Sequence, residues 1–161
     1  MNQNPYAPPN ARVEDSSSLT SNDFDPAGFW LRVLASIIDS ILLGIITVPL
    51  LLAIYGSSYY SKTTMLAGPA DFLVSWVLPI VLTVWFWSAR QATPGKMLLS
   101  LKIIDAETAQ PIGLRQSIIR YLGYFVSGIA LGLGFLWVAW DARKQGWHDK
   151  IAGTLVVRVH R

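Results

Sequence analysis

One aspartate inside an apolar stretch carries the most informative chemistry in this sequence. Asp39 lies in the apolar run Ala27–Tyr55, nine residues after Trp30. Nine residues correspond to about 14 Å along an α-helix. A carboxylate at that depth in a bilayer costs on the order of 3 kcal/mol. Asp39 is therefore expected to be protonated, to pair with a cation or to face a wet cavity, which makes it a candidate proton- or cation-binding residue.

Two arginines are candidate partners for the acidic residues. Arg32 lies seven residues before Asp39, on nearly the same helical face. Because side chains lean toward the N-terminus of a helix, Arg32 points away from Asp39. We therefore expect Asp39 to pair with Arg120, and Arg32 to pair with Asp149 or with a lipid phosphate. In the alternative interpretation these residues only clamp the helices together.

The sequence contains no recognisable enzyme or metal site. His148 precedes Asp149 in GWHDKIAGT, so the pair is a candidate proton relay, or else His148 is an interfacial residue that caps a turn. There is no HExxH motif, and Gly95-Lys96 lacks the remainder of a phosphate-binding loop. The absence of cysteine and the presence of only two histidines argue against thiol catalysis and Cys or His metal cages. We predict no enzymatic activity, no metal and no cofactor.

Composition and apolar runs indicate an integral membrane protein. Of the 161 residues, 52% are hydrophobic and 14% are charged, whereas a soluble domain has about 25% charged residues. The segments 27–55 and 70–88 approach or exceed the roughly 20 residues that a membrane-spanning helix needs. We predict an all-α membrane protein in contact with the lipid bilayer. Its net charge of +3 is attributed to topology-setting residues beside the spans, not to nucleic-acid binding.

A third apolar segment, 117–140, is compatible with two topologies. Its length allows a third span. Basic residues argue otherwise, because five lie between the second span and Arg120 inclusive, five follow Trp140, and only Lys62 lies between the first two spans. Basic residues mark the cytoplasmic side, so both ends of the segment are expected on that side, together with Trp30, Trp87, Trp140 and Trp147. This favours a re-entrant hairpin that turns near 127–134 and packs through its glycines.

The polar segments predict a tail and a small β element. Residues 1–26 are rich in proline, serine and asparagine and are expected to be disordered, with 4–9 as a possible polyproline-type docking motif for a protein partner. Residues 98–105 have strand character and 106–111 resemble a turn, which predicts a cytoplasmic β-hairpin. Residues 154–159 are a further short strand that could pair with it. Residues 159–161 form the C-terminal end.

Several motifs together resemble the RDD family of small bacterial membrane proteins. They are TPGKMLLSLKIID, IGLRQSIIRYL and WHDKIAGTLVV, together with Arg32 and Asp39 in the first span, and they cover roughly residues 27–158. The family is named after one arginine and two aspartates, which in this chain would be Arg32, Asp39 and Asp149. The resemblance implies a multi-pass protein of the bacterial cytoplasmic (inner) membrane, with its N-terminus in the cytoplasm. Family members are described as transporting unidentified ligands, and some as cation/proton antiporters.

Two functions from different classes follow as expectations. The first is transport of a monovalent cation in exchange for protons. Because two or three helices cannot easily enclose a pathway, this function requires a homo-oligomer. The second is a non-transporting membrane scaffold or assembly accessory protein, in which Arg32, Asp39, Arg120 and Asp149 clamp the helices.

Overall fold

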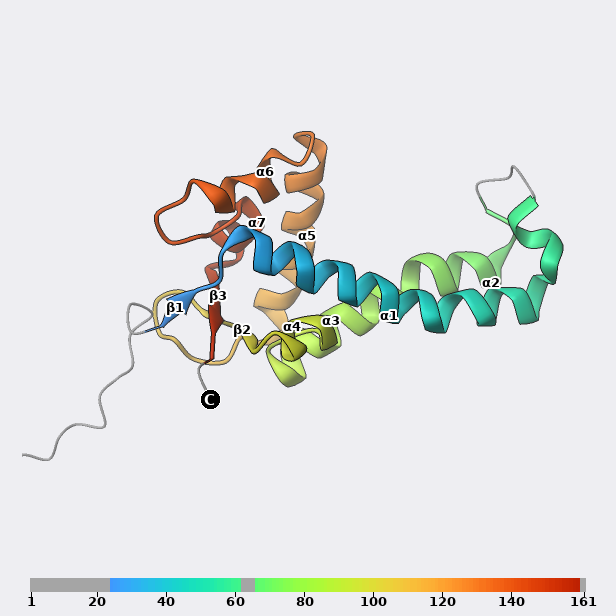
Figure 1. Cartoon of the computed structure of the whole chain (residues 1–161), viewed down its shortest axis with the longest axis horizontal. Coiled ribbons are helices and arrows are strands. Elements are labelled where there is room, and N and C mark those ends of the chain that lie inside the picture. The colour runs from blue at the N-terminus through green and yellow to red at the C-terminus, as the bar shows by residue number, and fades with distance from the viewer. Residues whose placement is uncertain (1–23, 62–65, 160–161) are drawn as a thin grey trace, which may run out of the picture.

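Two long apolar helices extend from one end of a smaller domain of short helices and a sheet (Figure 1). The computed structural model describes residues 24–61 and 66–159. The first long helix is α1 (Phe29–Tyr55), which continues through Pro49. The second apolar stretch, Pro69–Arg90, consists of α2 (Pro69–Phe72), the π-helical turn η3 (Leu73–Val77) and α3 (Leu78–Arg90). A short 3₁₀ helix, η2 (Ser57–Ser61), follows α1.

Both stretches are long and apolar enough to cross a membrane, as the sequence predicts for 27–55 and 70–88. In the most apolar 18-residue segment of α1, only 6% is buried inside the protein, and in the corresponding segment of Pro69–Arg90 the share is 11%. Many large apolar side chains, such as Ile41, Ile45 and Val81, are therefore exposed along them. An exposed apolar surface of this extent is typical of contact with lipid.

The π-helical turn in the second stretch has a local cause. Pro79 has no backbone N–H, so the carbonyl of Ser75 has no α-helical partner four residues later. The turn just before Pro79 widens to π geometry, which is one way in which a helix accommodates a disrupted hydrogen-bond ladder. The helix then resumes as α3 and ends at Gln91, which adopts the left-handed conformation.

A three-stranded antiparallel sheet joins segments that are distant in the sequence. Its order is β1-β3-β2, and its members are β1 (Asp25–Pro26), β2 (Leu101–Asp105) and β3 (Thr154–Arg158). In the register of the central pair, Leu101 lies opposite Arg158 and Asp105 opposite Thr154. The four residues Thr154–Val157 are all buried, which fits their apolar and β-branched character.

The sheet confirms one strand prediction and corrects two others. The strand at 154–159 is present and pairs with 101–105. The predicted local hairpin of 98–111 is wrong, because β2 pairs along its length with β3. Its contacts with the turn that follows it are limited to a bridge from Ile104 to Pro111 and local hydrogen bonds of Asp105. The predicted disorder of 1–26 is wrong at its end, since Asp25 and Pro26 pair with β3. Residues 1–23 of that tail, including the motif at 4–9, and residues 160–161 lie outside the described residues.

The third apolar segment forms a bent pair of helices. It consists of α5 (Leu114–Ile129), α6 (Leu133–Leu136) and the 3₁₀ turn η4 (Trp137–Ala139). The two arms meet at 111°, with Leu131 and Gly132 in the left-handed conformation at the bend. In Figure 1, α5 runs across α1 instead of alongside it. This geometry differs from that of a straight third helix.

Helix α5 has its polar face inward and its apolar face outward. Ser117, Arg120 and Ser127 are buried on the side where α5 packs against α7 (Trp147–Ala152). Ile118, Leu122 and Phe125 are exposed, as is Ile129 at its end. This distribution is the reverse of that of a helix on a soluble domain, and it suits a helix whose outer face contacts the apolar region of a bilayer.

The sheet holds both ends of this bent segment at one end of the molecule. Strand β1 precedes α1, β2 follows α3 and β3 follows the bent segment, yet the three strands are neighbours. A straight third span between β2 and β3 would place these strands on opposite sides of a membrane. The fold therefore agrees with the hairpin topology that the charge distribution favours.

A small apolar core supports the junction between the sheet and the long helices. Its fully buried members are listed together: Ala27, Ala35, Trp87, Leu101, Ile103, Ile112 and Val156. Trp87 is only 1% exposed, so its side chain packs inside this core. Helix α4 (Pro94–Leu98) connects α3 to β2 beside this core.

The placement of the sheet at one end predicts the outcome of cysteine labelling. The chain has no cysteine, so single substitutions give unique labels. Glu107→Cys and Arg158→Cys lie at exposed positions near the sheet, and Ser58→Cys lies at an exposed position at the far end of α1. In intact cells, Glu107→Cys and Arg158→Cys are expected to react alike with an impermeant maleimide, and Ser58→Cys is expected to differ from both in its labelling. Opposite accessibility of Glu107→Cys and Arg158→Cys would contradict the hairpin topology.

Candidate functional site

A fully buried carboxylate is the centre of the charged residues in this fold. Asp149 is 0% exposed and lies in the first turn of α7. Its Oδ2 accepts a hydrogen bond of 3.0 Å from the backbone N–H of Gly146, the residue that caps this helix. A carboxylate in the first turn also interacts favourably with the helix dipole. The sequence WHDK thus forms a helix start that directs Asp149 inward.

Arg32 pairs with Asp149, as the sequence predicts. Arg32 Nη1 donates to Asp149 Oδ2 at 2.5 Å. Its other nitrogens donate to backbone carbonyls, Nε to Ala27 at 3.0 Å and Nη2 to Lys144 at 2.6 Å. The guanidinium of the first long helix therefore has a partner for each nitrogen and ties α1 to α7 and to the loop before it.

Arg120 forms the second ion pair of Asp149 from α5. Its Nη1 lies 2.5 Å from Asp149 Oδ1, a close charge contact without hydrogen-bond geometry, and donates instead to Thr154 Oγ1 at 2.6 Å. The guanidinium also lies 5.1 Å from the ring centre of Trp87, within range of a cation–π interaction. Arg120 is 1% exposed, and its Nε has no hydrogen-bond partner among the described residues.

The two arginines keep the buried aspartate ionised. Burial alone would raise the pKa of Asp149, but the positive charges of Arg120 and Arg32 outweigh it and hold this pKa below the usual 3.8. Removing one member of a buried ion pair typically costs about 3–5 kcal/mol, because the other charge is left uncompensated. The Arg32–Asp149–Arg120 cluster is thus the strongest electrostatic constraint on how α1, α5 and α7 pack.

Asp39 does not pair with Arg120, and the predicted ion pair is wrong. Asp39 Oδ2 accepts from Thr93 Oγ1 at 2.5 Å, and Oδ1 accepts from the backbone N–H of Gly95 at 2.7 Å. The N–H groups in the first turn of a helix have no partner within that helix. Asp39 therefore caps α4 from the neighbouring helix α1, and both of its oxygens have hydrogen-bond partners.

The capping contact explains why the motif TPGK contains glycine. A Cβ atom on Gly95 would lie 2.3 Å from the carbonyl oxygen of Ala35 and 2.9 Å from Asp39 Cγ. Only a residue without a side chain allows α4 to approach α1 this closely. Pro94 and Gly95 are therefore the start of a packed helix.

His148 lies in the interior, between two aromatic rings. It is 4% exposed, and its ring centre lies 4.4 Å from that of Tyr124 and 5.2 Å from that of Phe135. Its Nδ1 lies 3.4 Å from Ser127 Oγ. Burial lowers the pKa of His148 from 6.5 to about 3, so the ring is neutral near pH 7. This argues against the proton relay, and the capping role predicted for His148 belongs to Asp149.

Lys96 is a functional candidate that sequence reasoning missed. In the sequence analysis Lys96 is only one of the basic residues that set the membrane topology, yet in the structure it is buried, with 6% of its surface exposed. Burial lowers its pKa, and its ammonium lies 5.3 Å from the ring centre of Trp87. The motif TPGK was the available signal, because a lysine directly after a tightly packed glycine follows that glycine into the interior.

Asp71 is a second polar centre, at the opposite end of the long helices. It is 4% exposed and accepts hydrogen bonds from Tyr59 Oη at 2.6 Å, Ser75 Oγ at 2.8 Å and the backbone N–H of Ala67 at 2.8 Å. These contacts fasten the connection between α1 and the second apolar stretch. Within residues 24–61 and 66–159, no group of three or more His, Asp or Glu side chains is arranged to hold a metal ion.

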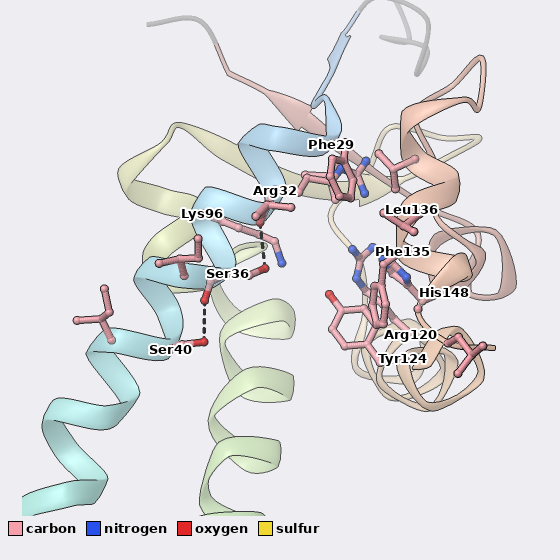
Figure 2. A pocket seen from close by; sticks show the side chains of 17 residues that line it. Phe29, Arg32, Ser36, Ser40, Lys96, Arg120, Tyr124, Phe135, Leu136 and His148 are labelled. Atoms are coloured by element: carbon pink, nitrogen blue, oxygen red, sulfur yellow. Dashed lines mark hydrogen bonds between the residues drawn. The ribbon is translucent and has the colours of Figure 1, made fainter. Parts of the chain in front are cut away.

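A cavity of about 750 Å³ opens between α1 and the bent α5–α6 segment (Figure 2). Its polar lining includes Arg32, Lys96, Arg120, Tyr124 and His148. Figure 2 shows the amine of Lys96 directed toward the same space as the hydroxyl of Tyr124 and the guanidinium of Arg120. The remaining lining is mostly apolar.

The fold and the charged cluster together define a class of protein. This class has two apolar helices of membrane-spanning length, joined to a small sheet domain by a buried arginine–aspartate cluster. The sequence profile of the RDD family matches residues 26–153, and the chain belongs to this family. Arg32, Asp39 and Asp149, the residues that the resemblance relates to the family name, all lie in buried or partly buried contacts.

Relatives from several bacteria resemble most of the chain. YxaI of Bacillus subtilis is 33% identical over 148 residues, which cover 82% of this chain and 97% of YxaI. The proline-rich antigen of Mycobacterium leprae is 32% identical over 151 residues, and the match covers 81% of this chain but only 61% of that relative. The membrane protein YteJ of Bacillus subtilis is 30% identical over 144 residues, covering 81% and 80% of the two chains. No solved structure matches this chain significantly.

The shared carboxylate predicts unequal and non-additive mutational effects. Arg32→Ala leaves Asp149 paired with Arg120, whereas Asp149→Ala strands both arginines. We expect Asp149→Ala to destabilise the protein by about 3–5 kcal/mol and Arg32→Ala by less. The double variant, Arg32→Ala with Asp149→Ala, should lose less stability than the sum of the losses of the two single variants. Thermal unfolding in detergent measures this, with the exposed Arg115→Ala as the control, and additive losses would contradict the contact.

The buried neutral histidine predicts a loss of stability in mild acid. The pKa of His148 is about 3 in the fold and 6.5 for a free histidine side chain, so between these values the unfolded chain binds more protons. Stability is then fully present above pH 6.5 and decreases as the pH falls, by up to about 1.4 kcal/mol per pH unit. We expect the melting temperature to fall between pH 7 and 4.5, and less steeply in His148→Gln. Equal slopes would contradict this assignment.

Proposed function

We propose that this chain is a non-transporting membrane scaffold or accessory protein, in which the family's arginine and aspartates clamp a small domain onto two membrane spans. One observation carries the proposal: the partners of these residues lie within the fold. Arg32 and Arg120 converge on Asp149, and both oxygens of Asp39 accept hydrogen bonds from the segment that leads into α4. Residues that are engaged in this way stabilise an arrangement of elements and leave no free carboxylate for an ion.

The proposal includes a placement in the bacterial cytoplasmic membrane. Both long helices have the length and hydropathy of spans, and a relative is called a membrane protein. The sheet end contains most of the basic residues, which supports a cytoplasmic location for it and for the N-terminus. The outward apolar face of α5 would then lie at the cytoplasmic surface of the bilayer.

A second candidate function, cation/proton transport by a homo-oligomer, has one observation in its favour. A cavity of about 250 Å³ lies beside Asp39 and between the long helices, and Pro79 and Thr83 contribute to its lining. A carboxylate near a proline-interrupted helix resembles the ion sites of some transporters. Two spans enclose no pathway by themselves, so this function requires several copies of the chain.

The variant Asp39→Asn distinguishes the two functions. It preserves the shape of the side chain but removes its charge. The N–H of Gly95 can still donate to the amide oxygen and the hydroxyl of Thr93 can accept from the NH₂ group, so two charge-assisted hydrogen bonds become weaker neutral ones and α4 is less well anchored. The scaffold proposal expects a stability loss of about 1–3 kcal/mol and no change in sodium-dependent proton flux across vesicles. Ser40→Ala is the matched control, since the hydroxyl of Ser40 bonds only to the carbonyl of Ser36.

The opposite outcome would favour transport. Sodium-dependent proton flux in the wild-type protein that disappears in Asp39→Asn, while the melting temperature stays unchanged, would overturn the scaffold proposal. Flux that persists in a destabilised Asp39→Asn would remove this residue from the transport mechanism.

A further inference from the structure

Lys96 is a buried cation without a carboxylate partner. Among the described residues, no carboxylate oxygen lies within 4 Å of its ammonium, whose identified contact is the ring of Trp87. Arg120, on the other side of the same cavity, has an Nε atom without a hydrogen-bond partner. Buried charges are normally paired, so this pattern indicates that the cavity accepts an anionic group from outside the chain.

The charges around the cavity are unbalanced even when all neighbours are included. Arg32, Lys96 and Arg120 line it, and His148 is neutral near pH 7. Tyr124 also lines it, and although burial acts to raise the pKa of this hydroxyl, the charges of Lys96 and Arg120 lower it. Asp149 lies behind the two arginines and compensates one of the three positive charges. The charge of Asp39 acts on Lys96, but the oxygens of Asp39 are engaged by Thr93 and Gly95. An excess of positive charge therefore remains at this position.

The rest of the cavity is suited to an apolar chain. One wall is the face of α1 that contains Phe29, Val33, Ile37 and Ile41. The opposite wall comes from the bent segment, with Leu131 and Leu136 among its members. A volume of about 750 Å³ lies in the range of pockets that hold organic molecules and exceeds what a bare inorganic anion requires.

We propose that this cavity binds an anionic phospholipid, with the phosphate group between Lys96 and Arg120 and an acyl chain against the apolar face of α1. Lys96 Nζ and Arg120 Nε would donate charge-assisted hydrogen bonds to phosphate oxygens. The lipid bridges α1 to the bent segment, so binding stabilises the folded protein. The inference rests on the membrane placement proposed above, because the acyl chain reaches the cavity from the bilayer.

Lipid selectivity of the full chain in detergent tests the proposal. The probes are phosphatidylglycerol, zwitterionic phosphatidylethanolamine and inorganic phosphate, and the readouts are lipid-bound species in native mass spectrometry and the shift in melting temperature. We expect binding and stabilisation with phosphatidylglycerol only. In Lys96→Met its apparent affinity should fall about tenfold or more, as is typical for the loss of a charged hydrogen bond. Lys102→Met, at an exposed lysine of β2, is the matched control and should bind like the wild type.

Two further measurements separate lipid binding from a structural role of Lys96. Because the unpaired ammonium is costly to bury, Lys96→Met without lipid should melt at or above the wild-type temperature. A lower melting temperature together with unchanged phosphatidylglycerol affinity would show that Lys96 is only structural and would overturn the proposal. Ser36→Trp fills the cavity without altering a charge and should also abolish binding, so the test does not depend on Lys96 variants alone.

The remaining outcomes also give clear answers. Equal stabilisation by phosphatidylethanolamine would overturn the proposal in favour of a general lipid effect, and a Lys96-dependent effect of inorganic phosphate alone would identify a soluble anion instead. Extraction of the chain from membranes by alkaline carbonate would reject the membrane placement itself. That result is independent of whether the purified protein selects phosphatidylglycerol.

Discussion

The carboxylate of Asp149 is the constraint on which the arrangement of this protein depends. A fully buried negative charge is tolerated only where cations compensate it, and here Arg32 from α1 and Arg120 from α5 provide that compensation. Both arginines can reach the carboxylate only if the beginning of α1, the middle of α5 and the start of α7 meet at one point. The sheet adds a second constraint, because β1, β2 and β3 bring together the segments before α1, after α3 and after the bent segment.

Beside the apolar core at the sheet, these two constraints produce helices that bury polar and charged groups and expose apolar ones. The long helices expose most of their apolar side chains, and α5 buries Ser117 and Arg120 while it exposes Ile118 and Leu122. In water this arrangement would be unfavourable, since apolar surface would remain hydrated. In a bilayer the outer surface is solvated by lipid, and the buried ionic cluster provides specific contacts between elements that the hydrophobic effect does not distinguish there.

The same cluster leaves a distinct electrostatic environment beside it. Asp149 compensates only part of the positive charge around the cavity, and Asp39 is used to anchor α4 to α1. The close approach at Gly95 directs the next residue, Lys96, into the interior, where it lies over Trp87 instead of in solvent. The close packing of Gly95 against α1 therefore also positions Lys96 in the candidate binding site.

Hydropathy by itself determined the two long helices, because an uninterrupted apolar run of that length has few other stable conformations in a membrane. The basic residues flanking the third segment likewise indicated that its ends lie together. Opposite charge made Asp149 one of two partners expected for Arg32, beside a lipid phosphate, and the structure shows the pair with Asp149. The tertiary structure alone decided the partner of Asp39, the burial of Lys96 and the pairing of β2 with β3. Each of these depends on contacts between residues about 50 or more positions apart, or on the approach of one backbone to another at Gly95, and neither local periodicity nor composition specifies such contacts.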